Sequence, residues 1–393
     1  MEEKSNISQL LTFYLPLYYL SFYLCRYGVL PVGPILVEKN SISMLDYGFS
    51  LSALYTGYFL MLIPAGVIVR KISVKKTIYT GVLGTISANI IILLANSSTI
   101  LFVALFLNGI SQGLIWPSLM QIVALNSTKK DAEWTVGLMM TSAILGPSIV
   151  FIIGSILISL NLWWAIFILG PSLLAVLTLK IIKTRINVRT QDIYKTTFLT
   201  KKSLILGGLN KEIIILSITY FCFYSILRGI VGWLPYFLIH EFNLKESLAS
   251  LGSGIFPILE TVGAFIGGYL SNRTKNFRKI FNYAFFLSFL LLSLYSFFNL
   301  PALTLGLAFI LISLPEWLFF SKLSYLVEKE HVGFASGFID MMGYIGSSTS
   351  NIIIGYIIST TKDYRNIILI LTLYSLLGFI FSLLIKSHKL SST

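Results

Sequence analysis

Long apolar stretches recur along the chain and are separated by short polar connections. Twelve such stretches are present, each close to the ~20 residues that a helix needs to cross a lipid bilayer. The runs are continuous rather than alternating, which favours helices over the strands of a membrane barrel. The sequence predicts an all-α polytopic membrane protein with twelve transmembrane helices, at 9–30, 47–69, 77–95, 100–125, 135–159, 163–180, 211–233, 247–271, 280–298, 302–325, 332–359 and 365–385.

The connection at 181–210 is the longest and most polar one, and it divides the segments into two sets of six. Arg26 and Arg228 are 202 residues apart, and so are Gly66 and Gly268, each of which precedes a basic loop. Two features at one offset indicate a duplication. We therefore predict two pseudo-symmetric six-helix bundles related by an axis along the membrane normal. Their predicted limits are 1–180 and 211–393, with 181–210 as a basic linker.

Lysines and arginines gather in alternate connections. The even-numbered connections and the tail hold most of them, whereas the odd-numbered connections hold only Lys39, Lys245, Lys362 and Arg365. Because cytoplasmic loops collect positive charge, this pattern predicts cytoplasmic termini and a multi-pass protein of the plasma or inner membrane. The basic residues of these connections also account for nearly all of the net charge of +13, so the charge gives no support for nucleic-acid binding.

Composition excludes other classes of protein. The chain is 56% hydrophobic and 11% charged, against ~45–50% and ~25% in soluble domains. The two cysteines both lie in apolar stretches, which excludes a disulfide-stapled scaffold. The three histidines lack metal-ligand spacing, and no loop of the ATP-binding type occurs. We expect no enzyme activity and no cofactor, and we expect a gradient as the energy source.

Five ionisable residues interrupt the apolar segments: Arg26, Arg228, Glu260, Glu316 and Asp340. A charge at mid-bilayer costs ~2.5–3.5 kcal/mol on insertion scales, so such residues tend to face a cavity. The two arginines occupy equivalent positions in the two halves, and guanidinium binds carboxylate or phosphate oxygens bidentately. The pair predicts an anion clamp, whereas internal ion pairs that only brace the bundle are the alternative.

Polar and aromatic residues accompany the arginines at helical spacing. Tyr19 and Tyr23 share one helix face with Arg26, and Tyr224 lies one turn before Arg228. An interfacial aromatic belt is the alternative for these tyrosines, and interhelical hydrogen bonding is the alternative for the other polar positions. The predicted substrate-binding residues are Arg26, Arg228, Tyr19, Tyr23, Tyr224, Gln112, Trp116 and Asn351, and the predicted gating or coupling residues are Glu260, Glu316 and Asp340.

Three segments carry a family resemblance: YYLSFYLCRYG at 18–28, LNGISQGLIWP at 107–117 and YSILRGIVGWLP at 224–235. Together they resemble the organophosphate:phosphate antiporters of the major facilitator superfamily, which include glycerol-3-phosphate and hexose-6-phosphate exchangers. The resemblance implies that Arg26 and Arg228 bind the phosphoryl group, with Tyr23 beside the first, and that Glu260 pairs with Arg228.

The chain also departs from the family pattern. Thr141-Ser142-Ala143 stands where the glycerol-phosphate members have a histidine, and Met61 stands near the position of their lysine. Glu316 and Asp340 lie outside the pattern and indicate proton coupling or a cationic group on the substrate. The substrate is therefore left open by the resemblance.

The sequence thus predicts a monomeric secondary transporter that exchanges a small phosphate ester for inorganic phosphate by alternating access. Its expected partners are a small anionic substrate, inorganic phosphate or a proton, and the lipid bilayer. Three alternatives remain: a proton-coupled carboxylate symporter, a sensor of the same fold that does not transport, and a multidrug:proton antiporter. Gly146-Pro147 suggests the last of these weakly, and buried arginines disfavour it.

Overall fold

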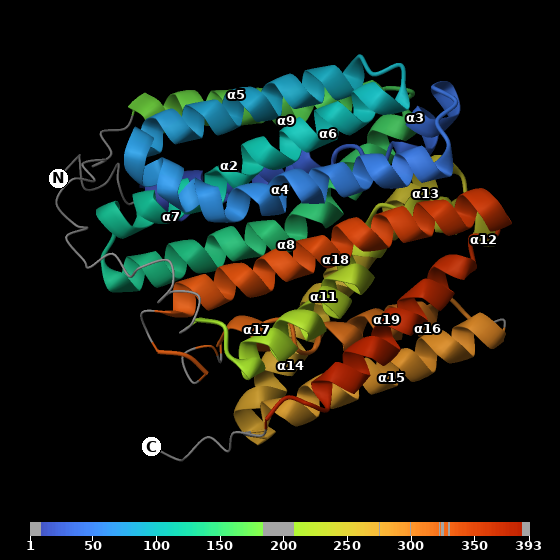
Figure 1. Cartoon of the computed structure of the whole chain (residues 1–393). Helices are drawn as coiled ribbons and strands as arrows, with labels where there is room; N and C mark the ends of the chain where they lie inside the picture. The colour runs from blue at the N-terminus through green and yellow to red at the C-terminus, as the bar shows by residue number, and fades with distance from the viewer. Residues whose placement is uncertain are drawn as a thin grey trace. The chain divides into compact units, whose positions relative to one another are not determined.

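The computed structural model describes residues 9–183, 208–274, 276–298, 300–321, 323, 326–328 and 331–386, and the elements formed by these residues are helices (Figure 1). Contacts divide the chain into two units. Unit 1 comprises Met1–Thr196 with Leu234–Ile239 and Asn243–Gly254, and unit 2 comprises Thr197–Trp233 with His240–Phe242 and Ile255–Thr393. Most of the predicted linker at 181–210 lies outside the described residues, so the domain limits drawn from it stay a prediction.

Unit 1 holds the helices of the first half of the chain and two short helices from the second. Its elements are η1 (Leu10–Tyr14), α2 (Leu15–Tyr27), α3 (Gly33–Lys39), α4 (Met44–Ile72), α5 (Val74–Leu93), α6 (Ser98–Gly113), α7 (Ile115–Asn126), α8 (Lys129–Ser159), η2 (Trp163–Ala165), α9 (Ile166–Lys183), most of α12 (Leu234–Phe242), and α13 (Glu246–Ser253).

Unit 2 holds the remaining helices. They are α11 (Lys211–Val231), α14 (Ile255–Thr274), α15 (Phe277–Phe297), α16 (Leu303–Ser313), α17 (Leu318–Ser321), α18 (Val332–Thr361) and α19 (Asn366–Ser382). Every predicted segment coincides with one of these helices or with two consecutive ones. Within the described residues, eight helical spans are long and apolar enough to cross a membrane.

The duplication extends to the helix boundaries. Helix α4 begins at Met44 and α13 at Glu246, 202 residues later, and α4 ends at Ile72 while α14 ends at Thr274, again 202 residues later. Helices α8 and α18 end at Ser159 and Thr361 with the same offset. A shared offset at both ends of long helices means that the two halves repeat one helical plan.

Three of the predicted segments are broken into two helices, which the apolar pattern did not reveal. The breaks fall at Leu114, at Gly254 and after Ser313. Prolines stand close to each break, at Pro117, Pro257 and Pro315. Proline lacks a backbone N–H and is tolerated in the first turn of a helix, where that N–H has no partner in any case. Pro117 and Pro257 lie in the first turn of the helix that follows the break, and Pro315 lies in the turn before α17.

Small residues allow close helix pairs inside each unit, and these pairs position the buried charges. In unit 1, α4 lies along α6, where Gly57 faces the Phe106 carbonyl oxygen and Gly109 faces that of Leu54, so that a Cβ at either glycine would overlap backbone (Figure 1). In unit 2, α14 lies against α16, where a Cβ at Gly267 would overlap the Leu314 carbonyl oxygen. Small residues of this kind are typical of membrane helix interfaces.

Candidate functional site

Arg26 lies in the last turn of α2 and is 4% exposed. Its Nε donates to Gln112 Oε1 at 2.7 Å, Gln112 Nε2 donates to Asn108 Oδ1 at 2.8 Å, and Asn108 Nδ2 donates to the Cys25 carbonyl at 3.0 Å. Each bond fixes the orientation of the next amide. Because both amides are neutral, this relay orients the guanidinium without cancelling its charge.

Two tyrosine rings flank the same guanidinium. Its carbon Cζ lies 4.9 Å from the ring centroid of Tyr23 and 4.3 Å from that of Tyr58. Both separations are within the range of cation–π attraction. Sequence reasoning found Tyr23 from its spacing but missed Tyr58, which α4 brings in through its close contact with α6. The adjacent Gly57 was the available signal, but a single sequence does not say which helix a glycine faces.

An aromatic wall continues from Arg26 along α2 and α7. The ring of Tyr19 lies 5.2 Å from that of Tyr23 and 5.2 Å from that of Trp116, measured between centroids. Tyr19 is buried and Trp116 is half-buried. The structure thus gathers the predicted residues Tyr19, Tyr23, Gln112 and Trp116 around Arg26, although the break after Gly113 lies between the last two.

Arg228 lies in the last turn of α11 in unit 2 and meets a carboxylate. Its Nη1 and Nη2 donate to Glu260 Oε2 and Oε1 at 2.9 and 2.6 Å, with side-chain exposures of 11% and 2%. Tyr224 lies beside this ion pair, with its ring centroid 5.5 Å from the guanidinium carbon. The two equivalent arginines therefore differ, because a neutral amide holds Arg26 through Nε and a carboxylate holds Arg228 through its terminal nitrogens.

Two further acids lie near this pair in unit 2. Glu316 stands in the turn between α16 and α17 and interacts with Glu260 and Arg228, while its Oε2 is buried without a hydrogen-bond partner. Asp340 on α18 lies within electrostatic reach of Tyr220 and Tyr224. The structure therefore places the buried Glu260 and the half-buried Glu316 beside Arg228, whereas the half-buried Asp340 lies near Tyr220 and Tyr224.

Asn351 lies fully buried on α18, where its amide bonds within unit 2. Its Oδ1 accepts from Trp233 Nε1 at 3.0 Å and its Nδ2 donates to the Ser347 carbonyl at 2.8 Å. The bond from Trp233 joins α18 to the residues just after α11, and the bond to Ser347 lies within α18. A role for Asn351 in substrate binding stays a prediction.

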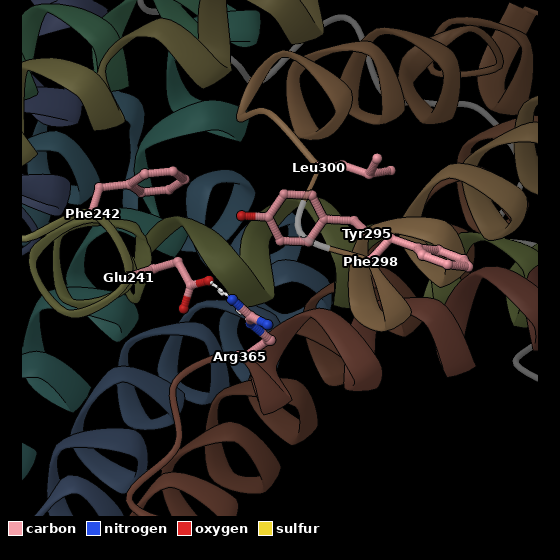
Figure 2. Close-up of a pocket in the computed structure, with 6 residues that line it drawn as sticks. All are labelled: Glu241, Phe242, Tyr295, Phe298, Leu300 and Arg365. Carbon is pink, nitrogen blue, oxygen red and sulfur yellow. Dashed lines mark hydrogen bonds and ion pairs between the residues drawn. The ribbon is translucent and has the colours of Figure 1, made fainter.

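A small cavity lies elsewhere in unit 2, at the end of α12 and the start of α19. It measures about 190 Å³, and Arg365 forms an ion pair with Glu241 at its edge, as Figure 2 shows. That hydrogen bond raises the pKa of Arg365, and burial lowers the pKa of the neighbouring His240, whose ring stacks on Tyr364. Sequence analysis did not anticipate this cavity, which Glu241, Phe242, Tyr295, Phe298, Leu300 and Arg365 line.

The family model of the Major Facilitator Superfamily matches residues 16–350. The chain belongs to the major facilitator superfamily. A glycerol-3-phosphate transporter of Bacillus subtilis (strain 168) is 22% identical over 377 residues, which cover 86% of this chain and 84% of that protein.

Solved structures of transporters share the fold. The nucleoside transporter NupG has a TM-score of 0.76 at 16% identity, covering 99% of this chain and 100% of that one. A bacterial homologue of the human lysosomal transporter Spinster has a TM-score of 0.78 at 12% identity, covering 96% and 97%. These likenesses confirm the all-α major facilitator fold. The chain is thus a multi-pass membrane protein of a transporter family, and this family is not one of enzymes.

Proposed function

We propose that this protein is a secondary active transporter that exchanges a small phosphate ester for inorganic phosphate. The observation that carries the proposal is the pair of buried arginines, Arg26 and Arg228, at equivalent positions of a duplicated chain. Guanidinium groups bind phosphate oxygens bidentately and keep their charge at any physiological pH. A buried cation at the equivalent position of each half suits an anionic substrate.

The different partners of the two arginines suggest separate roles. Gln112 leaves the charge of Arg26 in place, so Arg26 makes the first attraction for the anion. Glu260 neutralises Arg228, so the phosphoryl group replaces a carboxylate there and binds with the same bidentate geometry. Without substrate, Glu260 compensates a buried charge that would otherwise be costly. With substrate, both arginines bind the phosphoryl group, and transport follows by alternating access.

The rings next to the arginines fit the organic part of the substrate. Tyr19, Tyr23 and Trp116 form a wall beside Arg26, and Tyr220, Tyr224 and Tyr344 form a second one in unit 2, with centroids 4.5 and 5.5 Å apart along it. Aromatic faces pack against the C–H groups of a sugar or a similar ring. The likeness to a glycerol-3-phosphate transporter supports a phosphate ester as the cargo.

Glu316 favours a second candidate function. A carboxyl that is not part of the Arg228–Glu260 pair suits a proton-coupled symporter of organic anions such as carboxylates. In either case we propose a monomer in the plasma or inner membrane with cytoplasmic termini, because the basic connections lie on the side of the termini.

Counterflow in proteoliposomes tests the proposal. Vesicles preloaded with phosphate receive labelled phosphate outside, together with a panel of sugar phosphates, glycerol phosphate and carboxylates as competitors. Entry of labelled phosphate, with phosphate esters as the strongest competitors, supports the proposed exchanger. If the folded protein shows no phosphate counterflow but takes up carboxylate when a proton gradient is directed inward, the proton-coupled symporter replaces the exchanger as the proposed function.

A further inference from the structure

The carboxyl of Glu316 lies near another carboxyl, and this contact needs an explanation. Its Oε2 is buried and has no hydrogen-bond partner, and its carboxyl lies within interaction range of the Glu260 carboxyl and of Arg228. Two ionised carboxylates have only acceptor oxygens, so they repel each other and cannot satisfy this contact. One proton placed between them turns the contact into a hydrogen bond.

Helix packing holds the two carboxyls together. Glu316 follows Pro315 at the end of α16, and Glu260 lies on α14. A Cβ at Gly267 would overlap the Leu314 carbonyl oxygen, and a Cβ at Gly263 would overlap that of Ile310. Because α14 and α16 touch at these glycines, the two carboxyls have little freedom to separate.

Among the residues that the structure describes, the cation recorded as interacting with Glu316 is Arg228, which is already paired with Glu260. On α11, Arg228 gives both terminal nitrogens to Glu260, and Tyr220 and Tyr224 lie nearby as neutral phenols. On α18, Asp340 adds a further acid rather than a base. One guanidinium thus faces two close carboxyls, and Asp340 adds a third acid near Tyr220 and Tyr224.

We propose that Glu260 and Glu316 form a proton-binding site, and that one proton is shared between them in the substrate-free protein. Glu260 then neutralises Arg228 while Glu316 stays protonated. Loss of this proton at alkaline pH places a second negative charge beside Arg228. An incoming phosphoryl group then meets repulsion instead of attraction, so anion binding weakens roughly tenfold or more at alkaline pH. The effect on anion binding rests on the proposed function, whereas the proton itself does not.

Infrared spectroscopy of the purified full-length protein detects the proton directly, because a protonated carboxyl has a C=O band that a carboxylate lacks. We expect wild type at neutral pH to show such a band, with a shift in deuterium oxide and loss at alkaline pH. Glu316→Gln should lack it, while Glu328→Gln, an exposed glutamate with 83% side-chain exposure, should keep it. Wild type without the band, or a band that Glu316→Gln retains, overturns the proposal.

Phosphate counterflow across a pH series adds a functional readout. Titration of phosphate itself is the same for every variant, so it cancels in the comparison. We expect exchange by Glu316→Gln, taken relative to its own rate at neutral pH, to lack the alkaline decline of wild type, because glutamine stays neutral. If wild type shows the infrared band but no phosphate exchange, the proposed function fails and the proton site stands. If phosphate exchange occurs but the infrared band is missing, the proposed function stands and the proton site fails.

Discussion

Substituting Gln112 by glutamate tests whether a neutral partner at Arg26 matters. Gln112 Oε1 accepts from Arg26 Nε at 2.7 Å, so a glutamate fits the same space and differs by one negative charge. Arg26 would then be neutralised as Arg228 is by Glu260. Two unit charges 4 Å apart interact by ~4 kcal/mol at an effective dielectric constant of 20. We therefore expect phosphate affinity to fall by roughly a thousandfold, at ~1.4 kcal/mol for each factor of ten.

The assay is equilibrium binding of labelled phosphate to detergent-purified protein, with thermal unfolding as the check of folding. The new ion pair should leave the unfolding midpoint unchanged or higher. Gln121→Glu, an amide-to-carboxylate change at another buried glutamine of unit 1, is the matched control and should bind phosphate as wild type does. A Gln112→Glu protein that is folded and binds phosphate with wild-type affinity would refute this role of Arg26.

Three further outcomes follow from the packing. Gly267→Ala should lower the thermal unfolding midpoint in detergent, because its Cβ would overlap Leu314 backbone, whereas Gly268→Ala has no atom within 4 Å of the new Cβ and should not. Trp233→Phe leaves the buried Asn351 Oδ1 without its donor and should cost about 1–3 kcal/mol of unfolding free energy in denaturant titrations, and equal stability would contradict this. Tyr58→Leu should weaken phosphate binding by about 2- to 30-fold through lost cation–π attraction of ~0.5–2 kcal/mol, while Tyr58→Phe keeps the ring and should bind nearly normally.

Hydrophobic pattern and internal repeat predicted much of the fold. The offset of 202 residues between Arg26 and Arg228 recurs at the ends of α4 and α14, because both halves follow one helical plan. The hydrophobic pattern did not predict the helix breaks at Leu114 and Gly254, because apolar residues continue across them. A broken helix and a continuous one bury the same stretch of apolar residues, and only the backbone distinguishes them.

For the candidate site too, the sequence predicted some of the residue groupings and not others. Spacing along one helix grouped Tyr19 and Tyr23 with Arg26, because residues four apart share a helix face. Contacts between helices lay beyond this reasoning. Gln112 lies 86 residues from Arg26, and the Glu241–Arg365 pair spans 124 residues. The Arg228–Glu260 ion pair was expected only from a family resemblance.

Phosphate self-exchange by wild type, Arg26→Lys and Arg228→Lys in proteoliposomes tests whether the two arginines bind the transported anion. Lysine keeps the positive charge but loses the bidentate fork, so charge alone does not rescue the variants. We expect rapid exchange by wild type and a loss of about tenfold or more in each variant, with unfolding midpoints near that of wild type. Wild-type protein that is folded and exchanges no phosphate, or lysine variants that exchange it at the wild-type rate, would contradict the account.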